Sequence, residues 1–162
     1  MDAVVAVYSD WGIGAAGTQP VTVSADRVRF RELTTGHGVI VGRKTLADFP
    51  GGRPLKNRQN IVITRQNLEI PGAIVVHSGA EALEAAAAME QCFVIGGASI
   101  YRELFPALDR VFVTKVEACP VSDSFFPNLD ELPDWTCTAA EPWQEENGIR
   151  YQFCVYEKRK AE

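Results

Sequence analysis

The chain has 162 residues, enough to bury about 70% of its unfolded surface, and we expect it to form one domain over residues 1–162. Its net charge of −5 argues against general nucleic-acid binding, because contacts to phosphate backbones need a basic surface. No apolar run approaches the ~18 residues of a membrane span, and the first residues lack the features of a secretion signal. We therefore expect a cytoplasmic protein that contacts neither nucleic acid nor membrane.

The cysteines and histidines show no pattern typical of a metal site. Cys92, Cys119, Cys137 and Cys154 are widely spaced without a C-x-x-C pair, and the two histidines stand apart from each other. We expect four reduced structural thiols and no bound metal.

The N-terminal segment predicts a buried strand over Val4 to Tyr8, followed by the pattern G-x-G-x-x-G over Gly12 to Gly17. In a dinucleotide-binding fold these glycines open a helix, whereas residues 18–23 are β-branched and contain Pro20. The acid expected about twenty residues later is also misplaced, because Glu32 falls inside a predicted helix. We reject that fold and interpret the segment as a long, mobile, glycine-rich loop of the kind that forms an active-site lid.

Residues 21–33 predict a helix whose first turn carries Asp26. Ser24 is the expected N-terminal cap, and Val28, Phe30 and Leu33 are candidates for buried positions. An aspartate in a first helical turn is most often a solvated charge, so this segment alone does not assign it a function.

A second group of candidates follows the next strands. Residues 39–41 predict a buried strand leading into Gly42-Arg43-Lys44-Thr45 and a short helix over 45–49, which indicates either a phosphate cradle or a solvated basic turn. The strand over 60–63 ends at Thr64-Arg65, on the edge where α/β sheets bind ligands. A further strand over 73–77 ends at His77, a structural or rim residue.

The remaining segments predict more strands and helices. A helix is expected over 81–89, and a buried strand over 92–95 runs into Gly96-Gly97 and a helix through about residue 105. The backbone N–H groups at this turn can face a pyrophosphate, although a tight strand-to-helix turn explains the glycines equally well. Residues 111–116 predict a central strand, and 135–139 with 149–156 predict a closing hairpin around Asn147-Gly148.

Taken together, these segments resemble dihydrofolate reductase from end to end. Six motifs carry the resemblance: W-G-I-G at 11–14, S-A-D at 24–26 with Phe30 and Thr34-Thr35 downstream, V-G-R-K-T at 41–45, R-P-L-K-N-R at 53–58, V-I-G-G-A-S-I-Y at 94–101, and D-S-F-F-P at 123–127. The resemblance implies an α/β fold with an eight-stranded, mostly parallel twisted sheet, an antiparallel C-terminal edge strand and four flanking helices. It also implies an oxidoreductase of one-carbon metabolism that uses NADPH to reduce 7,8-dihydrofolate to tetrahydrofolate.

In that reaction a hydride passes to C6 of the pterin once N5 is protonated, and the resemblance gives Asp26 the task of assisting protonation, either directly or through a water. Apolar neighbours, Val4, Val5, Phe30 and Ile95, should raise the pKa of this carboxyl. Phe30, Phe49 and Leu55 would enclose the rings of the substrate, Thr114 would reach the pterin, and Arg58 would pair with the glutamate α-carboxylate. The full set of implied substrate residues is Val4, Val5, Asp26, Phe30, Arg31, Phe49, Arg53, Leu55, Arg58, Ile95, Tyr101 and Thr114.

For the cofactor, the resemblance implies that Arg43 and Arg65, helped by Thr64, bracket the 2′-phosphate, and that the Gly96-Gly97 peptide bond is cis. The implied cofactor residues are Ala6, Ile13, Gly14, Gly17, Gly42, Arg43, Lys44, Thr45, Thr64, Arg65, His77, Gly96, Gly97, Ala98, Ser99, Ile100 and Tyr101.

One departure from the family pattern concerns the lid. The family usually has Trp after the lid proline, whereas here Val21 follows Pro20, and Gln19 is also a less usual residue. The resemblance implies that this departure affects proton delivery, turnover and antifolate affinity. Two alternatives remain: a related reductase of riboflavin synthesis, which needs neither Asp26 nor the Arg58 clamp, and a non-catalytic binding module. We expect a monomer.

Overall fold

The structure is a computed structural model that describes residues 1–16 and 18–160. Contacts within the chain divide it into two compact units. The first unit consists of Met1 and Arg31–Ala107, a nearly continuous stretch of chain. The second unit combines Asp2–Phe30 with the chain from Leu108 onward, so it is built from both ends of the sequence.

The first unit contains four parallel strands in the order β6 (Cys92–Gly96), β3 (Gly38–Gly42), β4 (Gln59–Ile63) and β5 (Ala73–Val76). Every residue of β3 is buried, which explains why it reads as a continuous apolar run instead of alternating with polar residues. Because the strands are parallel, their carboxyl ends share one edge. The predicted strands of this region are thus confirmed.

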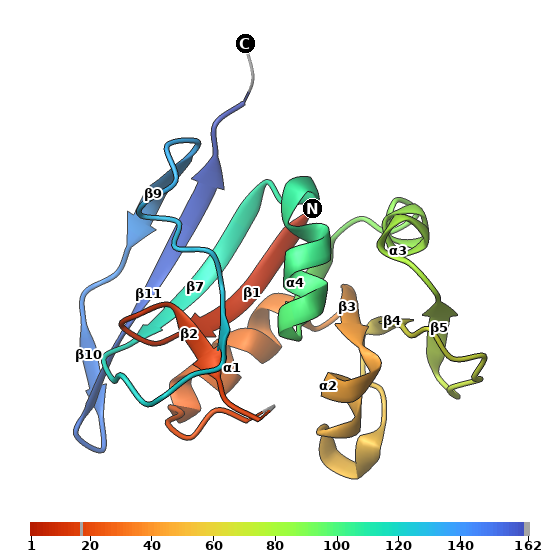
Figure 1. Ribbon diagram of the computed structural model, residues 1–162, viewed down its shortest axis with the longest axis horizontal. Coiled ribbons are helices and arrows are strands. Elements are labelled where there is room, and N and C mark those ends of the chain that lie inside the picture. Colours follow the sequence, from red (N-terminus) through yellow and green to blue (C-terminus); the bar gives the residue numbers. More distant parts are fainter. Residues whose placement is uncertain (17, 161–162) are drawn as a thin grey trace. The chain divides into compact units, whose positions relative to one another are not determined.

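The helices of the first unit follow these strand ends. They are α2 (Arg43–Ala47), α3 (Gly79–Ala86) and α4 (Ala98–Leu104), with 3-10 turns η1 (Pro50–Gly52) and η2 (Phe105–Ala107) (Figure 1). Ser78 caps α3 by accepting a hydrogen bond from Glu81 N at 3.1 Å. The helix α3 was predicted to reach Met89 but ends at Ala86. The reason is that Met89 N donates a hydrogen bond to Ala86 O, which closes a tighter turn of three residues.

The second unit is built on β7 (Arg110–Val116), which pairs with β1 (Asp2–Val7) in parallel and with β11 (Ile149–Lys158) antiparallel (Figure 1). Two further strands, β9 (Trp135–Ala140) and β10 (Gln144–Glu146), pair antiparallel with β11. α1 (Ser24–Thr34) begins in this unit. The mostly parallel α/β class with antiparallel C-terminal strands is confirmed, and the described residues form four α-helices.

No helix in the described part of the chain is both long enough and apolar enough to span a membrane.

Two predictions about loops need correction. The turn at Asn147-Gly148 joins β10 to β11, so the predicted partner strand β9 is not the other arm of this hairpin. Both turn residues have positive φ, 52° and 81°, as a two-residue hairpin turn requires. The predicted glycine-rich loop contains a short strand, β2 (Gly12–Gly14), which pairs with β8 (Ser124–Phe125).

The predicted buried face of α1 is also partly wrong. Val28 is 44% exposed, whereas Phe30 and Leu33 are half-buried. The reason is that Asp26 and Arg29, one turn apart, take the side of α1 that contacts β7. Polar side chains therefore occupy positions that a purely apolar pattern would assign to the core.

The core of the first unit gives a stability prediction. We expect Ile61→Ala to lower the free energy of unfolding by about 2–5 kcal/mol, because this side chain of β4 is fully buried and its removal leaves a cavity. Ile74→Ala on β5 is the matched control, since Ile74 is 46% exposed and should cost about 0.5 kcal/mol or less. Urea unfolding of both variants measures the difference, and equal losses would contradict this assignment of the core.

Candidate functional site

Asp26 is a half-buried carboxyl in the first turn of α1. The hydroxyl of Thr114, a buried residue of β7, donates a hydrogen bond of 2.7 Å to its Oδ1. Burial raises the pKa of Asp26, while this hydrogen bond and the charges of Arg29 and Arg27 oppose the rise without cancelling it. Asp26 therefore keeps its proton at a higher pH than an ordinary aspartate, as a general acid must.

The start of α1 is capped by a residue far away in the sequence. Glu146 of β10 accepts hydrogen bonds from Ser24 N and Ser24 Oγ, both at 2.6 Å, and from Ala25 N at 3.2 Å. These bonds lower the pKa of Glu146, and a carboxylate here is also favoured by the helix dipole. The prediction that Ser24 is the cap is wrong, because Ser24 is the first residue of the helix and its hydroxyl donates to Glu146.

The backbone of Val21 is held by the phenol of Tyr8. The hydroxyl of Tyr8 donates to Val21 O at 2.8 Å and accepts from Val21 N at 3.0 Å. Burial of Tyr8 raises its pKa, and its bond to the Val21 carbonyl partly offsets this. The segment just before α1 is thus fixed through its main chain, although Val21 has no indole. No sequence pattern marks Tyr8 as a site residue, because it is only the last residue of an apolar run.

The rest of the predicted lid is attached at further points. Ala16 N donates to Asp123 Oδ2 at 2.9 Å, and Asp123 N donates to Gly14 O at 3.0 Å. The side-chain amide of Gln19 donates to Ala6 O at 3.1 Å. These bonds connect the lid to β1 and to the segment before β8. Gly17, a predicted cofactor residue, lies outside the described residues.

Most of the predicted cofactor residues lie in the first unit, at the shared carboxyl edge of its parallel strands. This edge is where α/β sheets place their ligands. The structure brings together there thirteen of the predicted residues: Gly42, Arg43, Lys44, Thr45, Thr64, Arg65, His77, Gly96, Gly97, Ala98, Ser99, Ile100 and Tyr101.

Two glycines at this edge leave no room for a Cβ unless a neighbouring side chain shifts. A Cβ on Gly97 would lie 2.8 Å from Thr45 Oγ1, and a Cβ on Gly42 would lie 2.9 Å from Ile100 Cγ1. The Gly96-Gly97 peptide bond is cis, as predicted. Because Gly97 is the N-cap of α4 and Thr45 belongs to α2, the first turns of these two helices lie side by side. The N–H groups of such turns have no partners within their own helices, which fits a phosphate-bearing cofactor.

Thr64 and His77 form a second contact along the same edge. Thr64 is buried, its N–H donates to Val76 O at 3.0 Å, and its carbonyl lies 2.9 Å from His77 Nδ1. His77 is therefore held at the rim of the edge by the main chain of Thr64. Arg43 and Arg65 are exposed beside these residues, so their guanidinium groups are accessible to an anion.

The segment 55–58 of the first unit is fixed by the buried side chain of Asn60. Its Oδ1 accepts from Leu55 N at 2.9 Å, and its Nδ2 donates to Leu55 O at 2.9 Å and to Arg58 O at 3.1 Å. Asn60 was not predicted as a site residue, and its only signal is an amide side chain at the start of an apolar strand. It sets the position of two predicted substrate residues.

Arg58 is half-buried and donates through Nη2 to Thr35 Oγ1 at 3.2 Å. Burial lowers its pKa, and the positive charge of Arg31 lowers it further. Two guanidinium groups close enough to repel each other are favourable for a ligand with more than one carboxylate. Arg53, the third predicted cation of this region, is exposed.

The other predicted site residues divide by unit. In the first unit, Phe49 and Ile95 are half-buried and pack against the cluster of Val41, Leu46 and Val62. In the second unit, β1 contributes the buried Val4 and Val5 and the half-buried Ala6. β2 contributes the half-buried Ile13 and the buried Gly14, and α1 contributes the half-buried Phe30.

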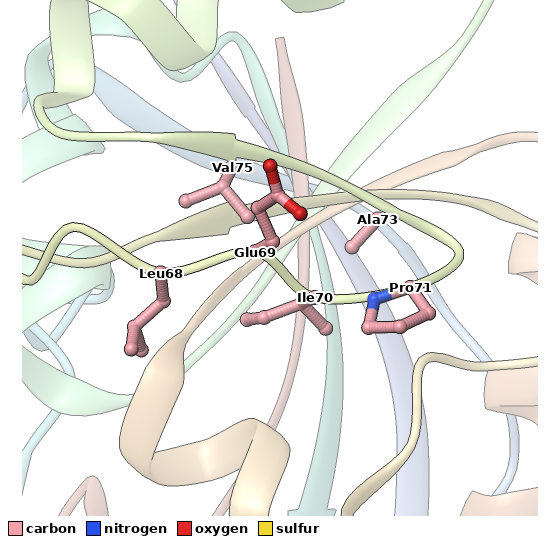
Figure 2. A pocket seen from close by; sticks show the side chains of 6 residues that line it. All are labelled: Leu68, Glu69, Ile70, Pro71, Ala73 and Val75. Atoms are coloured by element: carbon pink, nitrogen blue, oxygen red, sulfur yellow. The ribbon is translucent and has the colours of Figure 1, made fainter.

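A pocket of about 440 Å³ lies at the turn leading into β5, and Figure 2 shows the side chains that line it. Two of them, Ile70 and Ala73, also pack against the core cluster around Val41. None of the six lining residues, Leu68, Glu69, Ile70, Pro71, Ala73 and Val75, is a predicted site residue.

Comparison with known proteins agrees with this geometry. A family model described as dihydrofolate reductase matches residues 1–158. The dihydrofolate reductase of Bacillus subtilis is 39% identical over 152 residues, covering 92% of this chain and 89% of that protein. The dihydrofolate reductase of Rattus norvegicus is 37% identical over 183 residues, covering 98% of this chain and 97% of that protein.

A solved structure is also similar. The dihydrofolate reductase of Enterococcus faecalis, complexed with NADP(H) and RAB-propyl, matches with a TM-score of 0.87 and 30% identity. The match covers 98% of this chain and 96% of that one. The fold class predicted from the sequence is thereby confirmed.

The bonds between Tyr8 and Val21 give a second prediction. We expect Tyr8→Phe to lower the free energy of unfolding by about 1–3 kcal/mol, because it leaves the Val21 N–H and carbonyl without this partner. It should also speed amide hydrogen exchange selectively over residues 18–23. Tyr156→Phe is the control, since it removes another buried hydroxyl, one that donates to Asp130 Oδ1 at 2.7 Å. Equal exchange over residues 18–23 in the two variants would contradict the role of Tyr8.

Proposed function

The chain belongs to the dihydrofolate reductase family, and we propose that Asp26 assists the protonation step of the family's reaction. This reaction is the NADPH-dependent reduction of 7,8-dihydrofolate to 5,6,7,8-tetrahydrofolate. The observation that supports the role of Asp26 is its half-buried carboxyl, whose Oδ1 accepts a hydrogen bond from the Thr114 hydroxyl. Burial raises the pKa of this carboxyl.

Bound NADPH supplies the hydride that C6 of the pterin accepts. N5 of the pterin must gain a proton in the same reduction, so the protein has to hold a proton near a substrate that is shielded from water. Asp26 meets this need because its raised pKa favours the protonated carboxyl. Since Thr114 engages Oδ1, we assign Oδ2 to the pterin, where it would orient the ring through the amino group.

Arg58 is proposed to bind the α-carboxylate of the glutamate tail. Its support is the guanidinium held by Thr35, in a segment that Asn60 fixes through three hydrogen bonds. The nearby charge of Arg31 adds to the positive potential. Phe49 and Leu55 are half-buried and lie close to Arg58 in the sequence. They supply apolar surface for the rings of the substrate.

The cofactor is proposed to bind along the carboxyl edge of the parallel strands in the first unit. The turn at Gly96-Gly97 and the first residues of α2 would hold the pyrophosphate, because glycine lets the backbone come close there. Arg43 and Arg65, with Thr64, would hold the 2′-phosphate and so favour NADPH over NADH. We also propose that the protein acts in the cytoplasm as a monomer.

The role of Asp26 is tested by Asp26→Asn. We expect its turnover at neutral pH to fall by about 10²–10⁴-fold, because the amide cannot hold the proton. Acid should restore part of the loss, since solvent then protonates the substrate. In the parent, turnover should decline as the pH rises through the raised pKa of Asp26. The loss of NADPH absorbance in the presence of dihydrofolate measures the turnover of each protein across pH. Asp134→Asn is the control, because it removes an exposed carboxyl. Parental rates and pH profile in Asp26→Asn would refute this role.

Arg58→Leu tests the substrate clamp. We expect the Michaelis constant for dihydrofolate to rise by an amount equivalent to about 2–5 kcal/mol, because a partly buried charge pair loses one partner. The Michaelis constant for NADPH should not change. Arg150→Leu removes an exposed arginine paired with Glu117 and controls for loss of positive charge. Unchanged dihydrofolate affinity in a folded Arg58→Leu protein would exclude the clamp.

A further inference from the structure

α1 carries two charged side chains that meet the same strand. Asp26 and Arg29 are one helical turn apart, so both lie on one side of the helix. Asp26 Oδ1 accepts a hydrogen bond from Thr114 Oγ1 at 2.7 Å, and Arg29 Nη1 donates to Val113 O at 3.1 Å. Their partners are consecutive residues of β7. The guanidinium and the carboxyl are therefore anchored to adjacent residues of the same strand.

The guanidinium of Arg29 is enclosed by β7 and β11. Its Nη2 donates to Cys154 O at 3.4 Å. It also lies over the ring of Phe153 with 4.5 Å to the centroid, and 5.7 Å from the ring centroid of Phe112. A planar, delocalised guanidinium can stack on a ring while its fork of N–H groups donates to two carbonyls, whereas a lysine presents a compact point charge.

Among the described residues, the groups that act electrostatically on this pair come from α1, β7, β11 and the segment before β10. Burial raises the pKa of Asp26, whereas the Thr114 hydroxyl from β7 and the charges of Arg29 and Arg27 from its own helix lower it. Burial lowers the pKa of Arg29, and the carboxylates of Glu141, before β10, and of Asp26 raise it, as does Cys154 of β11. Arg27 is exposed, so solvent screens its charge, whereas Arg29 is half-buried. Of the two arginines, Arg29 has the stronger electrostatic effect on the carboxyl.

We propose that Arg29 is a positioning residue that sets the pH range over which Asp26 holds its proton for reduction. Arg29 acts through Asp26 and touches neither substrate nor cofactor in this proposal, which rests on the proposed role of Asp26. A permanent positive charge favours the ionised carboxylate, so Arg29 limits the rise in pKa that burial causes. Asp26 can then alternate between a carboxylate that orients the pterin and an acid that assists its protonation.

The experiment compares the parent with four variants. Arg29→Met removes the charge but keeps an apolar chain of similar reach, Arg29→Gln removes the charge but keeps a donor for Val113 O, and Arg29→Lys keeps the charge. Arg27→Met removes an equal charge from an exposed position of the same helix and is the matched control. Proteins labelled with 13C at the aspartate carboxyl are titrated by NMR, with the Asp26 signal assigned from Asp26→Asn, and thermal unfolding confirms that each variant is folded.

We expect the Asp26 titration to move to higher pH in Arg29→Met and Arg29→Gln, and to stay near the parent in Arg29→Lys. Arg27→Met should move it less than Arg29→Met. A titration in Arg29→Met or Arg29→Gln that superimposes on the parent, or a shift of equal size in Arg27→Met, would overturn the proposal. If Arg29→Met does not fold, Arg29→Gln decides alone.

A second measurement separates this inference from the role of Asp26. In single turnovers with NADPH and dihydrofolate, the alkaline decline in the hydride-transfer rate should move together with the NMR midpoint. If the titration of Asp26 moves while the rate profile does not, the effect of Arg29 on the carboxyl is upheld and the role of Asp26 in protonation is refuted.

Discussion

The hydrogen bond from the Thr114 hydroxyl to Asp26 is the interaction on which the candidate site in the second unit depends. Burying a carboxyl disfavours its charged form, so the stability that Asp26 contributes is full below its unfolded pKa and is lost as the pH rises through the raised folded pKa. Near neutral pH the burial of Asp26 therefore lowers the stability of the folded protein, and the hydroxyl of Thr114 and the guanidinium of Arg29 reduce this loss. Both groups are held on or against β7, whose place is fixed by β1 on one side and β11 on the other.

Much of the fold, and the grouping of many candidate site residues at one sheet edge, were predictable because the signals are local. Strands such as β3 and β4 are apolar runs ended by glycine or polar residues, since both faces of a parallel strand are covered. The candidate cofactor residues follow those runs directly along the chain. Parallel pairing then brings them to one edge without any further information, so Gly42, Thr64 and Gly96 could be grouped from the sequence.

The parts that could not be predicted depend on pairs of residues far apart in the chain. Tyr8 holds Val21, Glu146 caps α1, and Arg29 crosses to Cys154. No periodicity marks such pairs, because each partner satisfies its own local pattern. Val28 was misplaced for a related reason: an apolar pattern cannot show that a carboxyl and a guanidinium occupy the inner side of a helix. The short strands β2, β8 and β10 carry too few residues to produce a pattern.

The cap provided by Glu146 has a consequence for how the protein is made. A chain leaves the ribosome from its N-terminus, so α1 is available long before the residue that completes its first turn, which follows 122 positions later. The same holds for β1, whose partner β7 is also distant in sequence, whereas the β3–β6, β3–β4 and β4–β5 pairs of the first unit each form within one continuous stretch. The first unit can therefore form during synthesis. The helix that carries Asp26 completes its first turn only when the strand that carries Glu146 has been added to the chain.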